Sequence, residues 1–307
     1  MRERRIRTIG FILLLVLCAA ALYALHSNGG AWISSLQNHQ WSLNVPRLAA
    51  SALMLMITMA LTPRGWIMIC RAMGSETDSA QLNAAWFTSQ LGRYIPGKVW
   101  LFAGRAGFLK AKGMNGSRAL ATTAYELFFT VASVGLVSLF SALLVPDLVS
   151  GAAARTTGIA AACTMLMLPL LHPVQRFLCR RRGIPLDTLP SPGEAVKVTL
   201  FYTALWLGRG LSMYLLLTGA GIEAVQPVRA LAAAPLSWLA GYIVIVVPGG
   251  IGIREAAAAA IAAPQALAPA ALALGGQRLF MALIELLLAL FTSGKFLNAG
   301  GSNAAEK

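Results

Sequence analysis

The chain has 307 residues, of which 57% are hydrophobic and 12% are charged, and its formal net charge is +14. Soluble domains carry roughly 25% charged residues, so this composition excludes a soluble catalytic domain and predicts a polytopic membrane protein. The four cysteines and three histidines are scattered without metal-ligand spacing, and we therefore expect no metal site and no cofactor. In so apolar a chain, membrane topology explains the excess of cations better than nucleic-acid binding does.

Six apolar segments are predicted to be transmembrane helices, which makes the fold class an all-α polytopic integral membrane protein. They cover residues 8–25, 46–73, 119–145, 156–171, 196–219 and 270–297. The basic run before the first segment is also typical of a cleaved signal peptide. The length of that segment and the lack of a small-x-small cleavage site favour an uncleaved helix.

Two further apolar segments, about residues 80–109 and 228–263, are each interrupted by a Pro-Gly break. Proline removes a backbone donor and glycine permits a sharp reversal, so we predict a re-entrant hairpin at each break. Interrupted hydrophobic segments in corresponding positions of two halves are typical of a transport site.

The distribution of cations favours this re-entrant topology. With a cytoplasmic N-terminus, six crossings place 17 lysines and arginines, Arg105 among them, on the cytoplasmic side and three on the other side. Full crossing at both breaks would instead turn the basic loops 110–118 and 176–182 outward, against the positive-inside rule. We therefore expect a protein of the cell inner membrane with both termini in the cytoplasm. Five cations then lie at membrane depth: Arg93, Lys98, Arg209, Arg254 and Arg278.

An internal repeat is predicted within this single transmembrane domain, with residues 46–145 as unit one, 156–171 as a linking helix and 196–297 as unit two. Arg64-Gly65 matches Arg209-Gly210, and Glu126 followed by Leu-Phe-Phe matches Glu285 followed by Leu-Leu-Leu. Three crossings separate the units, so the repeat is expected to be inverted.

The helix that resumes after each Pro-Gly break should present free N–H groups and the positive end of its dipole, which favour an anion such as a phosphate. Lys98 and Arg254 add formal charge beside these helix starts, and Arg93 and Arg105 can converge on them. The alternative is that the breaks are plain helix interruptions whose cations snorkel toward water.

The carboxylates Glu126 and Glu285 lie in the middle of predicted helices. Such a carboxylate costs roughly 2.5–3.5 kcal/mol, so each needs a partner. Arg278 precedes Glu285 by two helical turns on the same face. Two interpretations stay open, a structural ion pair or a gating or proton-coupling group. The candidate partners of the two carboxylates are Arg118, Arg209, Arg254 and Arg278.

The segments Gly92-Arg93-Tyr94-Ile95-Pro96-Gly97-Lys98 and Pro248-Gly249-Gly250-Ile251-Gly252-Ile253-Arg254-Glu255 resemble the lysylphosphatidylglycerol synthase transmembrane-domain family, also called flippase-like. The resemblance covers about residues 46–297. It implies a helical domain that moves lipids between leaflets; the best-known members flip aminoacylated phosphatidylglycerol, and others accompany polyprenyl-linked glycan or hopanoid pathways. The lipid-headgroup residues that it implies are Arg93, Pro96, Gly97, Lys98, Arg105, Pro248, Gly249, Gly250, Arg254 and Glu255.

The chain departs from the family in two respects. Many members carry Gly-Gly-Asp before the arginine that corresponds to Arg105, where this chain has Phe102-Ala103-Gly104, so any role of that aspartate is absent. No aminoacyl-transferase domain precedes Lys307, and we do not expect an enzyme. The leading hypothesis is a translocase for a phosphate-bearing lipid, either an anionic phospholipid or a polyprenyl-phosphate-linked sugar. The alternative is a non-transporting accessory subunit that works with envelope-biosynthesis enzymes.

Overall fold

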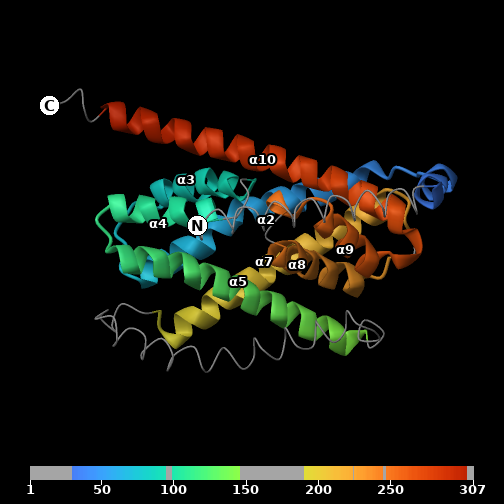
Figure 1. Cartoon of the computed structure of the whole chain (residues 1–307), viewed down its shortest axis with the longest axis horizontal. Helices are drawn as coiled ribbons and strands as arrows, with labels where there is room; N and C mark the ends of the chain where they lie inside the picture. The colour runs from blue at the N-terminus through green and yellow to red at the C-terminus, as the bar shows by residue number, and fades with distance from the viewer. Residues whose placement is uncertain (1–29, 95–98, 146–189, 224, 245–246, 303–307) are drawn as a thin grey trace, which may run out of the picture.

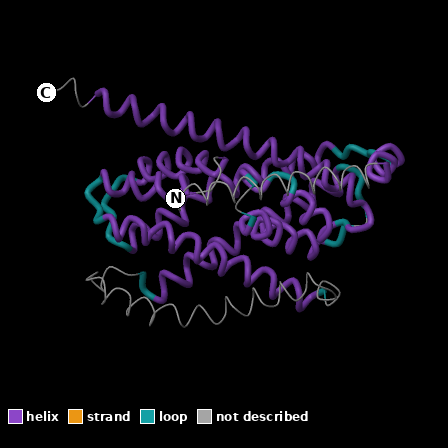
Figure 2. Tube along the Cα trace, viewed as in Figure 1, coloured by secondary structure: helices purple, strands orange, loops and turns teal. Residues whose placement is uncertain are grey.

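Helices form most of the chain that the structure describes, and these residues contain no strand (Figures 1 and 2). The structure is a computed structural model that describes residues 30–94, 99–145, 190–223, 225–244 and 247–302. Its α-helices are α2 (Val45–Ala72), α3 (Ser79–Gln90), α4 (Val99–Ala111), α5 (Gly116–Leu144), α7 (Pro192–Gly219), α8 (Pro227–Ile243), α9 (Ile253–Ala262) and α10 (Leu267–Ser302). Short 3-10 helices lie between them: η1 (Leu91–Tyr94), η4 (Pro248–Gly250) and η5 (Pro264–Ala266).

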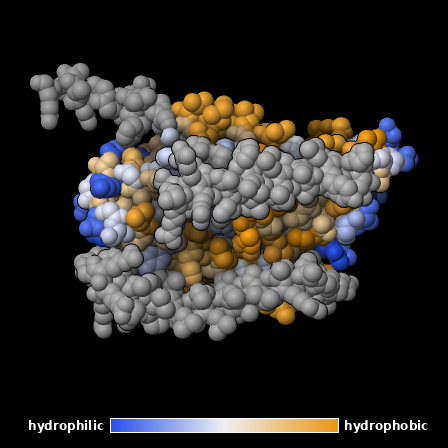
Figure 3. Space-filling model, viewed as in Figure 1, coloured by the Kyte–Doolittle hydropathy of each residue, from blue (hydrophilic) through white to orange (hydrophobic). Residues whose placement is uncertain are grey.

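Four segments are long and apolar enough to cross a membrane. They are Val45–Ala72, Gly116–Leu144, Pro192–Gly219 and Pro264–Thr292. Each corresponds to a predicted transmembrane helix, whereas the predicted helices at 8–25 and 156–171 lie outside the described residues. In the space-filling view, hydrophobic residues gather between two hydrophilic ends (Figure 3). The predicted all-α polytopic membrane fold is therefore confirmed.

Polar side chains mark where the long helices begin. Asn44 accepts a hydrogen bond from the backbone N–H of Arg47 (3.1 Å), and Asn115 accepts one from Ser117 (2.9 Å). Ser191 and Glu194 form a capping box at the start of α7. These caps satisfy backbone donors that the first helical turn leaves free.

Each predicted Pro-Gly break joins two helices that pack against each other. The first hairpin consists of α3 and α4, and the second of α8 and α9. At 1.5 Å per residue, α3 is roughly 18 Å long, which is less than the roughly 30 Å of a hydrocarbon core. The hairpins lie toward opposite ends of the molecule in Figure 1, and their tips, η1 and η4, contact each other.

Glycine is required at the second break. Gly249, Gly250 and Gly252 have φ angles of 61°, 71° and 82°. Residues with a β-carbon adopt this left-handed region only with strain, so the glycines permit the reversal between α8 and α9. A β-carbon on Gly250 would also lie 2.9 Å from the backbone of Gly241 on α8, which shows how closely the tip approaches its own first helix.

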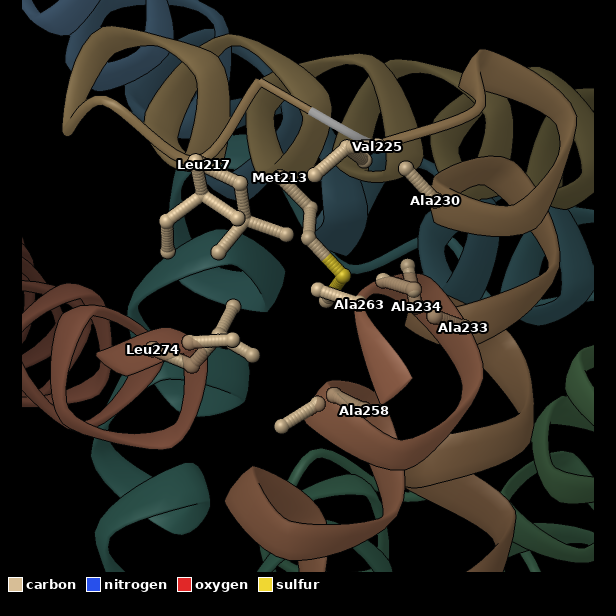
Figure 4. Close-up of a cluster of buried hydrophobic side chains, with 13 residues drawn as sticks. Met213, Leu217, Val225, Ala230, Ala233, Ala234, Ala258, Ala263 and Leu274 are labelled. Carbon is tan, nitrogen blue, oxygen red and sulfur yellow. The ribbon is translucent and has the colours of Figure 1, made fainter. Parts of the chain in front are cut away.

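Small residues allow the helices of the second half to pack closely. In Figure 4, alanines of α8 and α9 meet Met213 and Leu217 of α7 and Leu274 of α10. Across the contact of α2 with α7, Ser51 Oγ donates to the Ser212 carbonyl (2.7 Å), and Ser212 Oγ donates to the Ser51 carbonyl (2.9 Å). Close approach through small and hydroxyl residues is typical of helix packing in membranes.

The helix contacts of the two halves correspond to one another. The first helix of each hairpin contacts the long helix of the other half: α3 contacts α10, and α8 contacts α5. The second helix of each hairpin contacts the long helix of its own half: α4 contacts α5, and α9 contacts α10. This exchange is the pattern that the predicted inverted repeat would produce if α2, α3, α4 and α5 correspond to α7, α8, α9 and α10. The repeat itself, and its orientation in the membrane, stay predictions.

We predict that Gly210→Ala lowers the melting temperature of the detergent-solubilised protein. A β-carbon at this position of α7 would lie 2.5 Å from Leu231 Cα on α8, where backbone cannot move aside. Overpacking of this kind costs about 1–3 kcal/mol. Gly107→Ala on α4 is the matched control, because its β-carbon would have no neighbour within 4 Å. Equal melting temperatures for the two variants would contradict the close packing of α7 on α8.

Candidate functional site

A cavity of about 220 Å³ lies where the two hairpin tips face helices α2, α5, α7 and α10. Its described lining is mostly apolar and aromatic, but it includes five arginines and three glutamates. These charged residues are Arg93, Arg105, Arg209, Arg254, Arg278, Glu126, Glu255 and Glu285. The structure thus brings together the charged residues that the sequence analysis had placed at two separate breaks and at membrane depth.

Not every predicted site residue can be placed. Gly249 also lines the cavity, and Gly250 is buried against Gly241. Pro248 is the first residue of η4. Pro96, Gly97 and Lys98 lie outside the described residues.

Arg93 ties the first hairpin tip to α10. Its Nη2 lies 2.5 Å from Oε2 of Glu285, a side-chain pair that is almost fully buried. Tyr94 completes a three-residue cluster, because its hydroxyl accepts from Arg93 (2.9 Å) and donates to Glu285 (3.2 Å). The expectation that Arg278 pairs with Glu285 was therefore wrong. The two residues lie on one face of α10, but the carboxylate of Glu285 binds Arg93 of η1 instead.

Arg105 and Glu126 form a second ion pair at the centre of the first hairpin and α5. The Arg105 side chain is 2% exposed and donates also to Ser89 Oγ (3.0 Å) and Gln90 Oε1 (2.7 Å). The indole N–H of Trp86 donates to the other Glu126 oxygen (2.8 Å). Because each of the three guanidinium nitrogens donates to a partner on α3 or α5, Arg105 holds α3, α4 and α5 together.

One sequence-based assignment beside this pair was wrong. Arg118 does not pair with Glu126 but donates to the Met73 carbonyl, where it joins the start of α5 to the end of α2. Arg105 was counted among the cytoplasmic cations, a placement that stays a prediction, and its side chain is buried inside the first hairpin. The positive-inside rule counts cations by their position in the chain, so it cannot separate a loop cation from one that points into the bundle.

The third ion pair joins α10 to the second hairpin tip. Arg278 Nη1 lies 2.9 Å from Glu255 Oε1, and its Nη2 donates to the Gly249 carbonyl. The other Glu255 oxygen accepts from the N–H of Gly252 (2.6 Å). Free N–H groups were predicted at this helix start, but the N–H of Gly252 donates to Glu255.

Arg209 and Arg254 are left without a carboxylate partner among the described residues. Arg209 donates to Thr62 Oγ1 (2.6 Å), and its guanidinium carbon lies 5.0 Å from the ring centroid of Trp206. Arg254 lies along Gly241, where a β-carbon would be 2.4 Å from its Cγ. The Nε atoms of both arginines are buried and have no hydrogen-bond partner. With three of the five arginines paired, the described cavity lining keeps a formal charge of +2.

Aromatic rings form one wall of the cavity. The Trp206 and Trp238 centroids are 5.6 Å apart, and those of Trp238 and Tyr242 are 5.0 Å apart. An apolar, aromatic cavity with unneutralised guanidiniums suits an anionic group that is attached to an apolar body. Within the described parts of the chain, no cluster of three metal-ligating side chains is present.

Sequence reasoning did not identify Trp86, Tyr94 or Thr62 as site residues. Tyr94 falls inside the first motif, and this position is the only signal that could have pointed to it. Trp86 and Thr62 reach the site from other helices, so their roles depend on packing that a single sequence does not encode in any short pattern.

The fold and this site define a multi-pass α-helical membrane protein whose charged cavity is lined in part by the tips of two hairpins. The family model of the lysylphosphatidylglycerol synthase TM region matches residues 8–289. The chain therefore belongs to this family of membrane proteins, which takes part in lipid-related processes. No curated protein matches the chain.

We predict that Arg105→Met destabilises the protein by about 3–5 kcal/mol, because the change leaves the Glu126 carboxyl group buried without its partner. Adding Glu126→Gln to Arg105→Met should recover part of this loss, since the amide carries no charge and can still accept from Trp86. Thermal unfolding in detergent of the two single variants and the double variant measures the coupling. Purely additive losses would show that the pair does not act as a unit.

Proposed function

We propose that the protein moves a phosphate-bearing lipid between the leaflets of the cell inner membrane, with both termini in the cytoplasm. The observation that carries this proposal is the pair of guanidiniums, Arg209 and Arg254, that lack a carboxylate in a cavity between two hairpin tips. An unneutralised charge in an apolar bundle is costly, so it is retained where it serves an anionic ligand or an ion pathway.

The hairpins fit the proposed re-entrant placement. Backbone that is not helical is tolerated at membrane depth only where protein surrounds it or where it lines a water-filled cavity. Gly249 in the second break lines the cavity, and the first break lies between α3 and α4, which are both too short to cross alone. In this arrangement the tips meet near the membrane centre, and the polar headgroup passes between them while the lipid chains stay in the bilayer.

Arg254 is the main proposed headgroup contact. It stands at the start of α9, where the N-terminal end of the helix dipole adds a favourable potential for an anion. Guanidiniums bind phosphate through paired, charge-assisted hydrogen bonds. Glu255 follows Arg254 in the chain, but its carboxylate forms an ion pair with Arg278 and accepts from the N–H of Gly252 rather than pairing with Arg254. Membership of a lipid-related family supports a lipid as the ligand.

Leaflet-resolved movement of phosphate-bearing lipids in proteoliposomes tests this proposal. We predict that the wild-type protein moves at least one such lipid faster than empty liposomes do. Arg254→Gln should slow that movement by about tenfold or more, because a charge-assisted hydrogen bond contributes about 1.5–3 kcal/mol. Arg64→Gln is the matched control, because Arg64 is exposed and lies outside the cavity.

Movement equal to that in empty liposomes, for every anionic phospholipid and polyprenyl-phosphate sugar tried, would contradict a translocase and favour the accessory-subunit alternative. Equal slowing by Arg64→Gln and Arg254→Gln would contradict the cavity as the route.

A second prediction concerns Arg278, which forms an ion pair with Glu255. Arg278→Gln should slow lipid movement, because the released Glu255 carboxylate can neutralise Arg254. The double variant Arg278→Gln with Glu255→Gln should recover much of the movement, since the amide removes the competing charge and can still accept from Gly252. The same proteoliposome assay measures both variants. If the double variant is as slow as Arg278→Gln alone, Glu255 does not control the availability of Arg254.

A further inference from the structure

The two arginines without carboxylates belong to different parts of the cavity wall. Arg209 is on α7 and is held by Thr62 of α2, whereas Arg254 begins α9 and packs on Gly241 of α8. They therefore approach the cavity from two different helix pairs.

The electrostatic surroundings of these two arginines also differ. The charges of Arg93 and Glu285 act on both arginines, and those of Arg278 and Glu255 also act on Arg254. Because different helix pairs hold them, the two guanidiniums are separate positive centres, and the Arg93–Glu285 pair is a common neighbour of both.

From this geometry we infer that the ligand headgroup carries two singly charged phosphate groups, one for Arg209 and one for Arg254. This inference rests on the proposed function and names its substrate class. Two sources share this chemistry: a phospholipid with two phosphodiesters, as in cardiolipin, and a prenyl lipid whose sugar is attached through a diphosphate. A headgroup with one phosphate would neutralise one centre and leave the other unpaired in an apolar cavity, which is unfavourable.

A cationic headgroup fits this cavity less well. The described lining carries an excess of two positive charges, and each of its three glutamates already binds an arginine. Two of the aromatic faces that could hold an amine are occupied by guanidiniums, Arg209 over Trp206 and Arg105 over Trp86. A bound amine would therefore compete with arginines both for the carboxylates and for the aromatic faces.

Equilibrium binding to the detergent-solubilised full chain tests this inference without requiring transport. Three short-chain probes are compared at one salt concentration: a phosphatidylglycerol, a cardiolipin and a prenyl diphosphate hexose. Quenching of tryptophan fluorescence reports binding, because Trp86, Trp206 and Trp238 line the cavity. We expect at least one two-phosphate probe to bind about tenfold or more tightly than phosphatidylglycerol, and the tighter of the two identifies the source of the ligand.

Variants at Arg209 test whether this residue binds the second phosphate specifically or only strengthens the binding of every anionic probe through its charge. Arg209→Gln should weaken the tight two-phosphate probe by about tenfold or more and change phosphatidylglycerol binding much less. Arg64→Gln, at the position that matches Arg209 in the predicted repeat, should change neither. Arg209→Lys keeps the charge and should keep the preference, which guards against a folding defect of the glutamine variant.

The outcomes also distinguish this inference from the proposed function. Equal affinities for the three probes, or equal weakening of all of them by Arg209→Gln, would overturn the two-phosphate inference and leave the translocase proposal standing. Binding of none of the probes would overturn both.

Discussion

An ionised side chain inside an apolar helix bundle costs several kcal/mol unless it has a partner, and this constraint organises the centre of the molecule. Three ion pairs supply the partners that this constraint requires, and each pair joins two different elements. Arg105–Glu126 joins α4 to α5, Arg93–Glu285 joins η1 to α10, and Arg278–Glu255 joins α10 to α9. These pairs hold both hairpin tips beside the cavity. They also use all three of its described carboxylates, so that two arginines stay available to an anionic ligand.

Helix α10 has a particular place in this arrangement. Arg278 and Glu285 lie two turns apart on one face of α10, and they bind the second and the first hairpin tip respectively. Figure 1 shows α10 extending along one side of the bundle, past both hairpins. A shift of α10 would therefore change the contacts of both tips together. In the proposed translocase, this coupling gives the two tips a common element through which a headgroup could be passed from one to the other.

Hydropathy, Pro-Gly spacing and the cost of buried charge were enough to predict the fold class, the four described spans and the two breaks. Together with the family resemblance, they named all eight charged residues of the described cavity lining. The ion pairs could not be predicted in the same way. Helical periodicity relates residues of one helix, so it correctly put Arg278 and Glu285 on one face. The residue that reaches each carboxylate, however, depends on how separate helices pack. Arg105 shows the same limit, because its burial follows from contacts of α4 with α3 and α5 rather than from its position in the chain.

The central claim is that the cavity holds a phosphate-bearing headgroup on Arg209 and Arg254. Native mass spectrometry of the protein released from mild detergent tests this most directly, because it identifies the lipids that stay bound. The account predicts that the wild-type protein and Arg64→Gln retain a phosphate-bearing lipid, and that the double variant Arg209→Gln with Arg254→Gln loses it while remaining folded. Retention of the same lipids in the same amounts by the folded double variant would contradict the account.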